Sequence, residues 1–163
     1  MKKDSIDELQ VDWGQQRPDL NNEAMGVILR IQALAKVFGG QTAEKLGQLE
    51  LQWWQYDVLS TLRRQGKPYV MAATDLADAT MLTSGAMTNR IDRLEADKLV
   101  RRLRDDDDGR RVLVELTYWG LELVETAAKA RFQVAMEALG GLTSKQRETL
   151  SDLLRILLAD QDD

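Results

Sequence analysis

The sequence of 163 residues contains no cysteine and no histidine. A chain without cysteine has no disulfide framework, no thiolate nucleophile and no thiol redox sensor. It lacks the ligands of a Cys/His zinc site, and without an imidazole it has no general base poised near neutral pH. Catalysis would need a carboxylate, a lysine or a tyrosine, and no motif supplies such a site. We therefore expect a protein that is not an enzyme and that binds no cofactor and no metal.

Long apolar runs are also missing, since none reaches the ~18 residues that a helix needs to span a bilayer. The N-terminal segment MKKDSIDE provides no apolar core for a signal peptide. We therefore expect a cytoplasmic protein without a membrane partner. Hydrophobic residues make up 44% of the chain, which is enough to bury a core, and the length fits one domain with helical extensions.

A formal net charge of −5 argues at first against DNA binding. The charge is unevenly distributed, however. Residues 61–114 carry 11 basic and 9 acidic side chains, a net +2, whereas residues 1–60 and 115–163 carry net charges of −3 and −4. A local basic face can supply phosphate contacts even where acidic flanks weaken non-specific binding. We therefore expect any nucleic-acid interface in the middle of the chain.

The first twenty residues are predicted to form a short helix and a turn. Three apolar residues recur at helical spacing: Ile6, Leu9 and Trp13. Gly14 and the segment 17–19 are expected to interrupt this helix. A longer helix follows, capped by Asn21 or Asn22. Residues 39–40, both glycine, are expected to bend or end it, with a tail towards Gly47.

Residues 52–98 are patterned as three helices. The first covers Gln52 to Gln65 and precedes a small strand at 69–71. The second covers Ala73 to Ala79, and after a short turn the third runs from a cap at Thr83 or Ser84 to about Lys98. Two short helices joined in this way are typical of a helix-turn-helix, whose second helix reads base edges in the major groove.

The start of this last helix carries groups that suit DNA. Met87, Ile91 and Leu94 are expected to face inwards, since they recur at i, i+4 and i+7. The outward positions offer small hydroxyls, an amide and arginines, which bind bases and phosphates, and a glycine that lets the backbone approach closely. We expect DNA contacts from six residues of the helix: Ser84, Gly85, Thr88, Asn89, Arg90 and Arg93.

Two strand-like runs follow, at 99–104 and 112–116, and the charged, glycine-containing connection between them predicts a β-hairpin. Such a hairpin forms the wing of a winged helix-turn-helix, and Arg110 and Arg111 near its tip suit the narrow minor groove. Asp108 is expected to orient Arg110 by a bidentate pair. The alternatives are a plain solvated turn and a calcium loop, and the sequence lacks the Asp-x-Asn-x-Asp-Gly pattern of the latter.

The C-terminal part is predicted to form a long helix from a cap at Thr117 to about Leu139, then a final helix behind a capping box at 143–146. The apolar stripe of the final helix is wider than one small domain needs, so we expect a dimer interface rather than intramolecular core. Five leucines form the stripe: Leu150, Leu153, Leu154, Leu157 and Leu158. A two-fold dimer would bind a pseudo-palindromic DNA site.

Two segments resemble the MarR family. Residues 82–95, LTSGAMTNRIDRLE, resemble its recognition helix, and residues 105–117, DDDDGRRVLVELT, resemble its wing. The likeness covers roughly residues 25–160. It departs from the family pattern at Asp106, where a proline is usual, and at Ala72-Ala73, which replaces a Ser/Thr-Pro helix start and leaves that helix without a good cap.

The resemblance implies a mainly α fold with a small β-hairpin, which is a winged helix-turn-helix with N- and C-terminal dimerisation helices. Residues 1–20 would form an extra helix and a turn, and residues 21–163 the MarR-like domain. Within that domain we expect the core at about 52–117 and the dimerisation helices at about 21–47 and 118–160. The implied function is a homodimeric repressor that binds double-stranded DNA. The alternative is a dimeric adaptor whose winged helix binds protein.

The missing cysteine removes thiol-based sensing, so a small-molecule effector is expected. Residues 12–20, DWGQQRPDL, resemble the extra helix of the urate-responsive, PecS-like branch of the family. That resemblance implies an effector site of Trp13, Asp57, Arg90 and Arg102 in which the tryptophan stacks on a purine anion. The alternative effector is a phenolic or other lipophilic aromatic anion. The alternative role of Trp13 is to pack the extra helix onto the domain.

Overall fold

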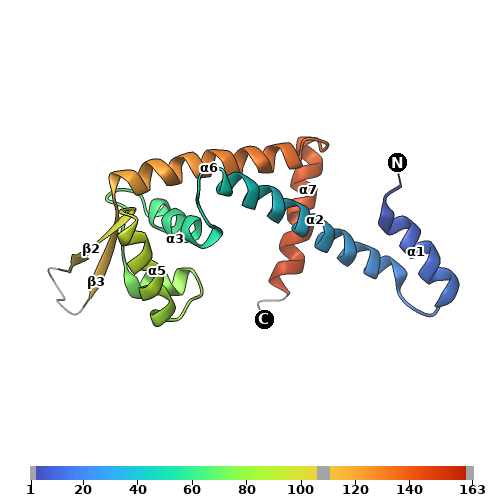
Figure 1. The fold of residues 1–163 in the computed structure, drawn as a ribbon. Coiled ribbons are helices and arrows are strands. Elements are labelled where there is room, and N and C mark those ends of the chain that lie inside the picture. The colour runs from blue at the N-terminus through green and yellow to red at the C-terminus, as the bar shows by residue number, and fades with distance from the viewer. Residues whose placement is uncertain (1–2, 106–110, 161–163) are drawn as a thin grey trace. The chain divides into compact units, whose positions relative to one another are not determined.

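The computed structural model describes residues 3–105 and 111–160. It divides the chain into two compact units, residues 1–41 and 42–163. The elements follow in the order α1 (Ser5–Gln16), α2 (Asn22–Gly47), α3 (Trp53–Arg64), β1 (Val70–Ala72), α4 (Ala73–Ala79), α5 (Ser84–Ala96), β2 (Val100–Arg104), β3 (Val112–Leu116), α6 (Tyr118–Ala138) and α7 (Ser144–Ala159) (Figure 1). Of the helices within the described ranges, none is long and apolar enough to cross a membrane.

In the first unit, polar contacts attach α1 to α2. The guanidinium of Arg30 donates to the carboxylates of Asp4 and Asp7 at 2.9 Å. The Gln10 amide donates to the Asn22 carbonyl at 2.8 Å, and the Asn22 amide returns a hydrogen bond to the Gln10 carbonyl at 2.6 Å. No residue of α1 is buried. The helix is therefore held by charged and amide groups rather than by an apolar core.

Two glycine predictions in this unit were wrong. Gly14 does not interrupt α1, which continues to Gln16 and ends where Arg17 caps it. Residues 39–40 do not end α2, which runs unbroken to Gly47. A single glycine costs a helix only about 1 kcal/mol, which neighbouring contacts can offset. The predicted cap was right, because the Asn21 side chain accepts a hydrogen bond from the Ala24 N–H at 3.0 Å.

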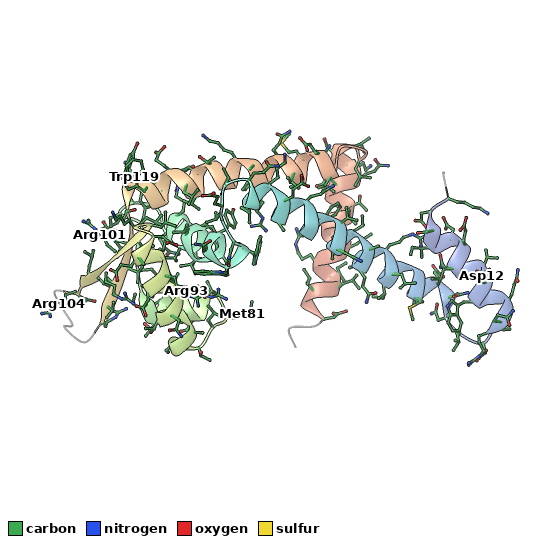
Figure 2. The ribbon with its side chains drawn as sticks, viewed as in Figure 1. Asp12, Met81, Arg93, Arg101, Arg104 and Trp119 are labelled. Carbon is green, nitrogen blue, oxygen red and sulfur yellow. The ribbon has the colours of Figure 1, made fainter. Side chains whose placement is uncertain are left out.

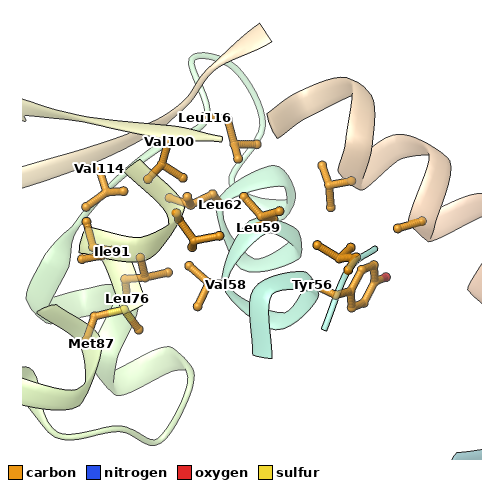
Figure 3. Packing of buried hydrophobic residues seen from close by; sticks show 14 of the residues in the cluster. Tyr56, Val58, Leu59, Leu62, Leu76, Met87, Ile91, Val100, Val114 and Leu116 are labelled. Carbon is orange, nitrogen blue, oxygen red and sulfur yellow. The ribbon is translucent and has the colours of Figure 1, made fainter. Parts of the chain in front are cut away.

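The second unit is built around α3, whose Val58, Leu59 and Leu62 are fully buried. Helices α4 and α5 pack on one side of them, and the sheet and α6 complete the core (Figure 3). The inward positions predicted for α5, Met87, Ile91 and Leu94, are confirmed as buried, and Leu76 and Ala77 of α4 are buried as well. Each large side chain buried in this way contributes roughly 1.5–3 kcal/mol.

The predicted hairpin is present and belongs to a three-stranded antiparallel sheet in the order β1-β3-β2. Strand β2 pairs with β3 from Val100 opposite Leu116 to Arg104 opposite Val112. Strand β1 pairs with the other edge of β3, which places Val70 opposite Glu115. The sequence predicted the small strand near residue 70 but not its partner, which lies more than forty positions along the chain.

Local hydrogen bonds fix both ends of α5. The Thr83 hydroxyl caps its start by accepting from the Ala86 N–H at 3.3 Å. The helix ends at Ala96, two residues before the predicted end, because Lys98 has a positive φ of 60° and the Leu99 N–H returns to the Leu94 carbonyl at 2.8 Å. This Schellman arrangement stops a helix by turning the backbone into the left-handed region.

The start of α6 is joined tightly to the segment that connects α5 with β2. The Thr117 hydroxyl caps α6 by accepting from the Gly120 N–H at 3.0 Å, and it donates to the Lys98 carbonyl at 2.7 Å. The Thr117 N–H donates to the Leu99 carbonyl at 3.0 Å. A Cβ atom on Gly120 would lie 1.9 Å from that same carbonyl oxygen. Only glycine permits this approach.

The capping box predicted for α7 is present, since the Thr143 hydroxyl accepts from the Gln146 N–H and the Gln146 side chain accepts from the Thr143 N–H. No residue of α7 is buried within the chain. The five leucines of the stripe are 37–66% exposed. Their apolar surface is therefore not used by the intramolecular core of the described residues.

Candidate nucleic-acid interface

Helix α5 presents one polar side to solvent because its opposite side is fixed in the core by Met87, Ile91 and Leu94. Five of the six residues predicted there to contact DNA are exposed: Ser84, Gly85, Thr88, Asn89 and Arg93. The sixth, Arg90, is half-buried. Figure 2 labels Arg93 on this helix and Arg101 and Arg104 along the neighbouring strand β2.

Two details define the first turn of this surface. The Thr88 hydroxyl donates to the Ser84 carbonyl at 2.9 Å, so its proton is used within the helix and its oxygen remains as an acceptor. A Cβ atom on Gly85 would meet nothing within 4 Å. Packing inside the chain therefore does not require glycine at this position. Because glycine has no side chain, the helix backbone here can approach a bound partner closely.

The arginines near this surface fall into two groups. Arg102 binds the carboxylates of both Asp92 and Glu95, which ties β2 to α5. Partial burial opposes the charge of this guanidinium, but the hydrogen bonds from the two carboxylates more than offset it, so the pKa of Arg102 lies above its usual value. By contrast, Arg90 and Arg93 have no carboxylate partner among the described residues.

A hollow of about 330 Å³ lies between the start of α3 and the exposed side of α5. It is lined by Trp54, Ala86, Asn89, Arg90 and Arg93. The Arg90 guanidinium lies over the Trp54 ring, 5.6 Å from its centroid. The sequence did not predict Trp54 as part of this surface. Its contact with Arg90 joins residues 36 positions apart, and no local pattern in the sequence signals it.

A second hollow of about 210 Å³ lies between the start of α4, α5 and β3. Its polar lining comes from Thr74, Ser84, Thr88 and Arg111. The Arg111 guanidinium lies 3.3 Å from the Asp75 carboxylate of α4 and 3.9 Å from that of Asp105. The other wing residues of the prediction, Arg110 and Asp108, lie outside the described residues. The described wing arginine is thus oriented by acids on both sides.

Three of the four residues predicted for effector binding belong to the second unit: Asp57 on α3, Arg90 on α5 and Arg102 on β2. Arg102 is paired with its two carboxylates, and the Arg90 guanidinium lies over the Trp54 ring. The half-buried Asp57 forms no ion pair within the described ranges. Trp13 lies on α1 in the first unit, where its side chain is 48% exposed.

The part of the chain that carries this surface matches a known protein family. Residues 49–111 match the model described as the MarR family. Over 142 residues the chain is 28% identical to the HTH-type transcriptional regulator PecS of Dickeya dadantii (strain 3937), an alignment that covers 87% of this chain and 86% of PecS. Residues 49–111 are therefore a domain of the MarR family.

Solved MarR-family structures share the fold. A Cys-to-Ser mutant of MarR from E. coli, in complex with operator DNA, is 28% identical with a TM-score of 0.70, covering 84% of this chain and 96% of that one. AbsC, a MarR family transcriptional regulator from Streptomyces coelicolor, has a TM-score of 0.77 at 22% identity, covering 88% and 97%. The second match supports the fold alone.

Within residues 3–105 and 111–160, no cluster of acidic side chains could hold a metal ion.

Proposed function

We propose that this MarR-family chain is a DNA-binding transcriptional regulator that acts as a homodimeric repressor on a pseudo-palindromic operator. The observation that carries the proposal is the side of α5 that faces solvent, where two arginines with no carboxylate partner among the described residues lie beside exposed hydroxyl and amide groups. Such groups bind phosphates and base edges. The winged-helix core at about 52–117 would supply the DNA contacts, with dimerisation helices on either side of it.

The exposed leucines of α7 support the dimer. An apolar stripe of this size exposed on a helix marks an interaction surface in a folded protein. A second copy of the chain would cover it, and a two-fold dimer would place the two α5 helices in successive major grooves, about 34–36 Å apart.

The proposed effector is a small aromatic anion, urate or a related purine. Support comes from Trp13, which offers an exposed indole, and from Arg90 and Arg102, which offer two cations on the DNA-binding unit. An anion that binds Arg102 must compete with Asp92 and Glu95, which now tie β2 to α5. Such competition would loosen the wing from the recognition helix and so couple ligand binding to DNA release.

The proposed function is tested by gel-shift titration with DNA from immediately upstream of the chain's own gene. We expect retardation at nanomolar protein that weakens steeply with added salt, because phosphate contacts release counterions. A random-sequence duplex of the same length is the control and should bind far more weakly. Equal binding to both duplexes, or none to either, would contradict the repressor and favour the protein-binding adaptor.

Replacing Trp13 with alanine is expected to weaken the effector response and leave DNA binding unchanged. The indole supplies the stacking surface in the proposed site, whereas Trp13 itself lies outside the DNA-binding unit. The measurement is the urate concentration that releases half of the bound DNA, and we expect it to rise at least tenfold. Trp13→Phe keeps an aromatic face and should respond at an intermediate concentration.

An unchanged urate response in Trp13→Ala would remove urate stacking from the proposal and leave Trp13 with a packing role. A thermal-shift screen with urate, xanthine, hypoxanthine and salicylate then decides between effector classes, since a bound ligand raises stability by mass action. Stabilisation by salicylate alone would favour the phenolic class.

A further inference from the structure

Arg90 is an arginine held by a ring instead of by a carboxylate. Its guanidinium is half-buried, and its one described side-chain partner is the Trp54 indole at 5.6 Å. Other arginines of the second unit are neutralised by acids: Arg63 by Glu125, Arg101 by Glu115 and Arg102 by Asp92 and Glu95. The positive charge of Arg90 therefore remains available to an anion from outside the chain.

Trp54 is itself fixed at the start of α3. Its indole N–H donates to the Gln52 side chain at 2.6 Å, and its ring packs against the buried core. Gln52 is in turn held by Gln55, whose side chain accepts from the Gln52 N–H at 2.9 Å. The ring thus presents a surface of defined orientation. A ring attracts a guanidinium that lies over it through its π face and offers no carboxylate oxygen, so the N–H donors of the guanidinium remain available to other acceptors.

The hollow beside this stack has the chemistry of an anion site. Its polar lining consists of Arg90, Arg93 and Asn89, and it contains no acidic side chain. Neither arginine has a carboxylate partner among the described residues. The volume of about 330 Å³ is many times the ~30 Å³ that one water molecule occupies in the liquid, so a larger anionic group fits.

We propose that this hollow binds a backbone phosphate of double-stranded DNA, and that Trp54 is the positioning residue that holds Arg90 towards it. The inference rests on the proposed DNA-binding function and deepens it, because it extends the DNA surface from the helix-turn-helix pair α4–α5 to α3. The occupant follows from charge: two guanidinium groups, neither paired with a described carboxylate, and an amide border an open surface of the helix that is proposed to bind DNA. A contact of this kind positions the protein and carries no sequence information.

The test is a double-mutant cycle with Trp54→Leu, Arg90→Ala and the combined variant. Trp54→Leu keeps an apolar side chain but removes the ring, and we expect it to weaken DNA binding three- to tenfold. Arg90→Ala should weaken binding tenfold or more and lower the slope of log K against log salt concentration by about 1.8, because the proposed homodimer would lose two phosphate contacts. The combined variant should bind within twofold of Arg90→Ala, because the ring acts only through the arginine.

Two features separate a positioning role from a packing role. The losses should be equal on the upstream duplex and on the random-sequence duplex, since a phosphate contact is not sequence-specific. Trp54→Phe, which keeps a ring, should restore binding to within twofold of the unsubstituted protein. Trp53→Leu is the matched control, because this neighbouring tryptophan also stacks on an arginine, Arg131 at 4.7 Å, but does not line the hollow. It should leave DNA binding unchanged.

The outcomes distinguish the two levels of the proposal. If the unsubstituted protein binds no DNA, the proposed function fails. If it binds and Trp54→Leu binds equally well, or if the losses of the two single variants multiply in the combined one, the positioning role is overturned while the proposed function stands. If Arg90→Ala binds DNA normally but loses protection by inorganic phosphate in a thermal-shift assay, the hollow binds a free anion and the DNA phosphate contact is overturned.

Discussion

Replacing Gly120 with alanine is expected to destabilise the DNA-binding unit by about 3 kcal/mol or more. The added Cβ would lie 1.9 Å from the Leu99 carbonyl oxygen and 2.9 Å from its carbon. Both atoms are backbone atoms, so no side chain can rotate away to make room. A loss of this size corresponds to a fall in Tm of roughly 10 °C, measured by circular dichroism or scanning calorimetry.

Gly39→Ala is the matched control for this substitution. Gly39 also lies in a long helix, but a Cβ atom there would meet nothing within 4 Å. Alanine at this position should leave the stability unchanged or raise it by about 0.5–1 kcal/mol, the usual gain in a helix. Gly39→Ala should melt at or above the temperature of the unsubstituted protein. If Gly120→Ala melts within 2 °C of the unsubstituted protein, the close contact with Leu99 is wrong.

The variant with Leu153→Glu and Leu157→Glu is expected to be a monomer with a DNA affinity lower by a factor of about 10² to 10⁴. The two leucines are 56% and 46% exposed, so the substitutions disturb no intramolecular core. In a dimer they would bury charged carboxylates without partners, which strongly opposes association. Affinity would fall because two linked half-sites bind far more tightly than one. Analytical ultracentrifugation gives the oligomeric state, and the gel-shift assay gives the affinity.

The control for this variant is Ala159→Glu, which adds a carboxylate to the same helix on the side away from the leucine stripe. It should remain a dimer and bind DNA normally. A dimeric Leu153→Glu, Leu157→Glu protein would show that α7 is not the contact between copies. A monomer with unchanged DNA affinity would instead contradict the two-half-site operator.

The sequence predicted the DNA-binding unit well because its signals are local. Residues 87, 91 and 94 point inwards as their spacing requires, and the hydroxyls of Thr83, Thr117 and Thr143 cap the helices that they precede. Caps and apolar periodicity depend on neighbours within a few positions, so one sequence contains them completely. The α4 helix, which lacks a side-chain cap at Ala72, was also predicted at its observed bounds.

What the sequence could not predict depends on contacts between distant positions. The pairing of β1 with β3, the stacking of Arg90 on Trp54 and the pairing of Arg111 with Asp75 each join segments more than thirty residues apart. The length of α1 was also missed, because the penalty of Gly14 is small compared with the contacts that Arg30 and Asn22 make to that helix. The sequence therefore predicted which arginines belong to the surface, but it did not predict the side chains that they contact.

The hydrogen bonds of Thr117 and the close approach of Gly120 to Leu99 restrict how α6 can move. The first turn of α6 is hydrogen-bonded to the connection between α5 and β2. We therefore expect α6 and the wing strand β2 to move as one rigid unit at this point. Helix α6 has 21 residues and is therefore about 30 Å long. A tilt of about 5° over this length displaces the far end of the helix by about 2.6 Å. Helix α5 and the wing would move together with the first turn of α6.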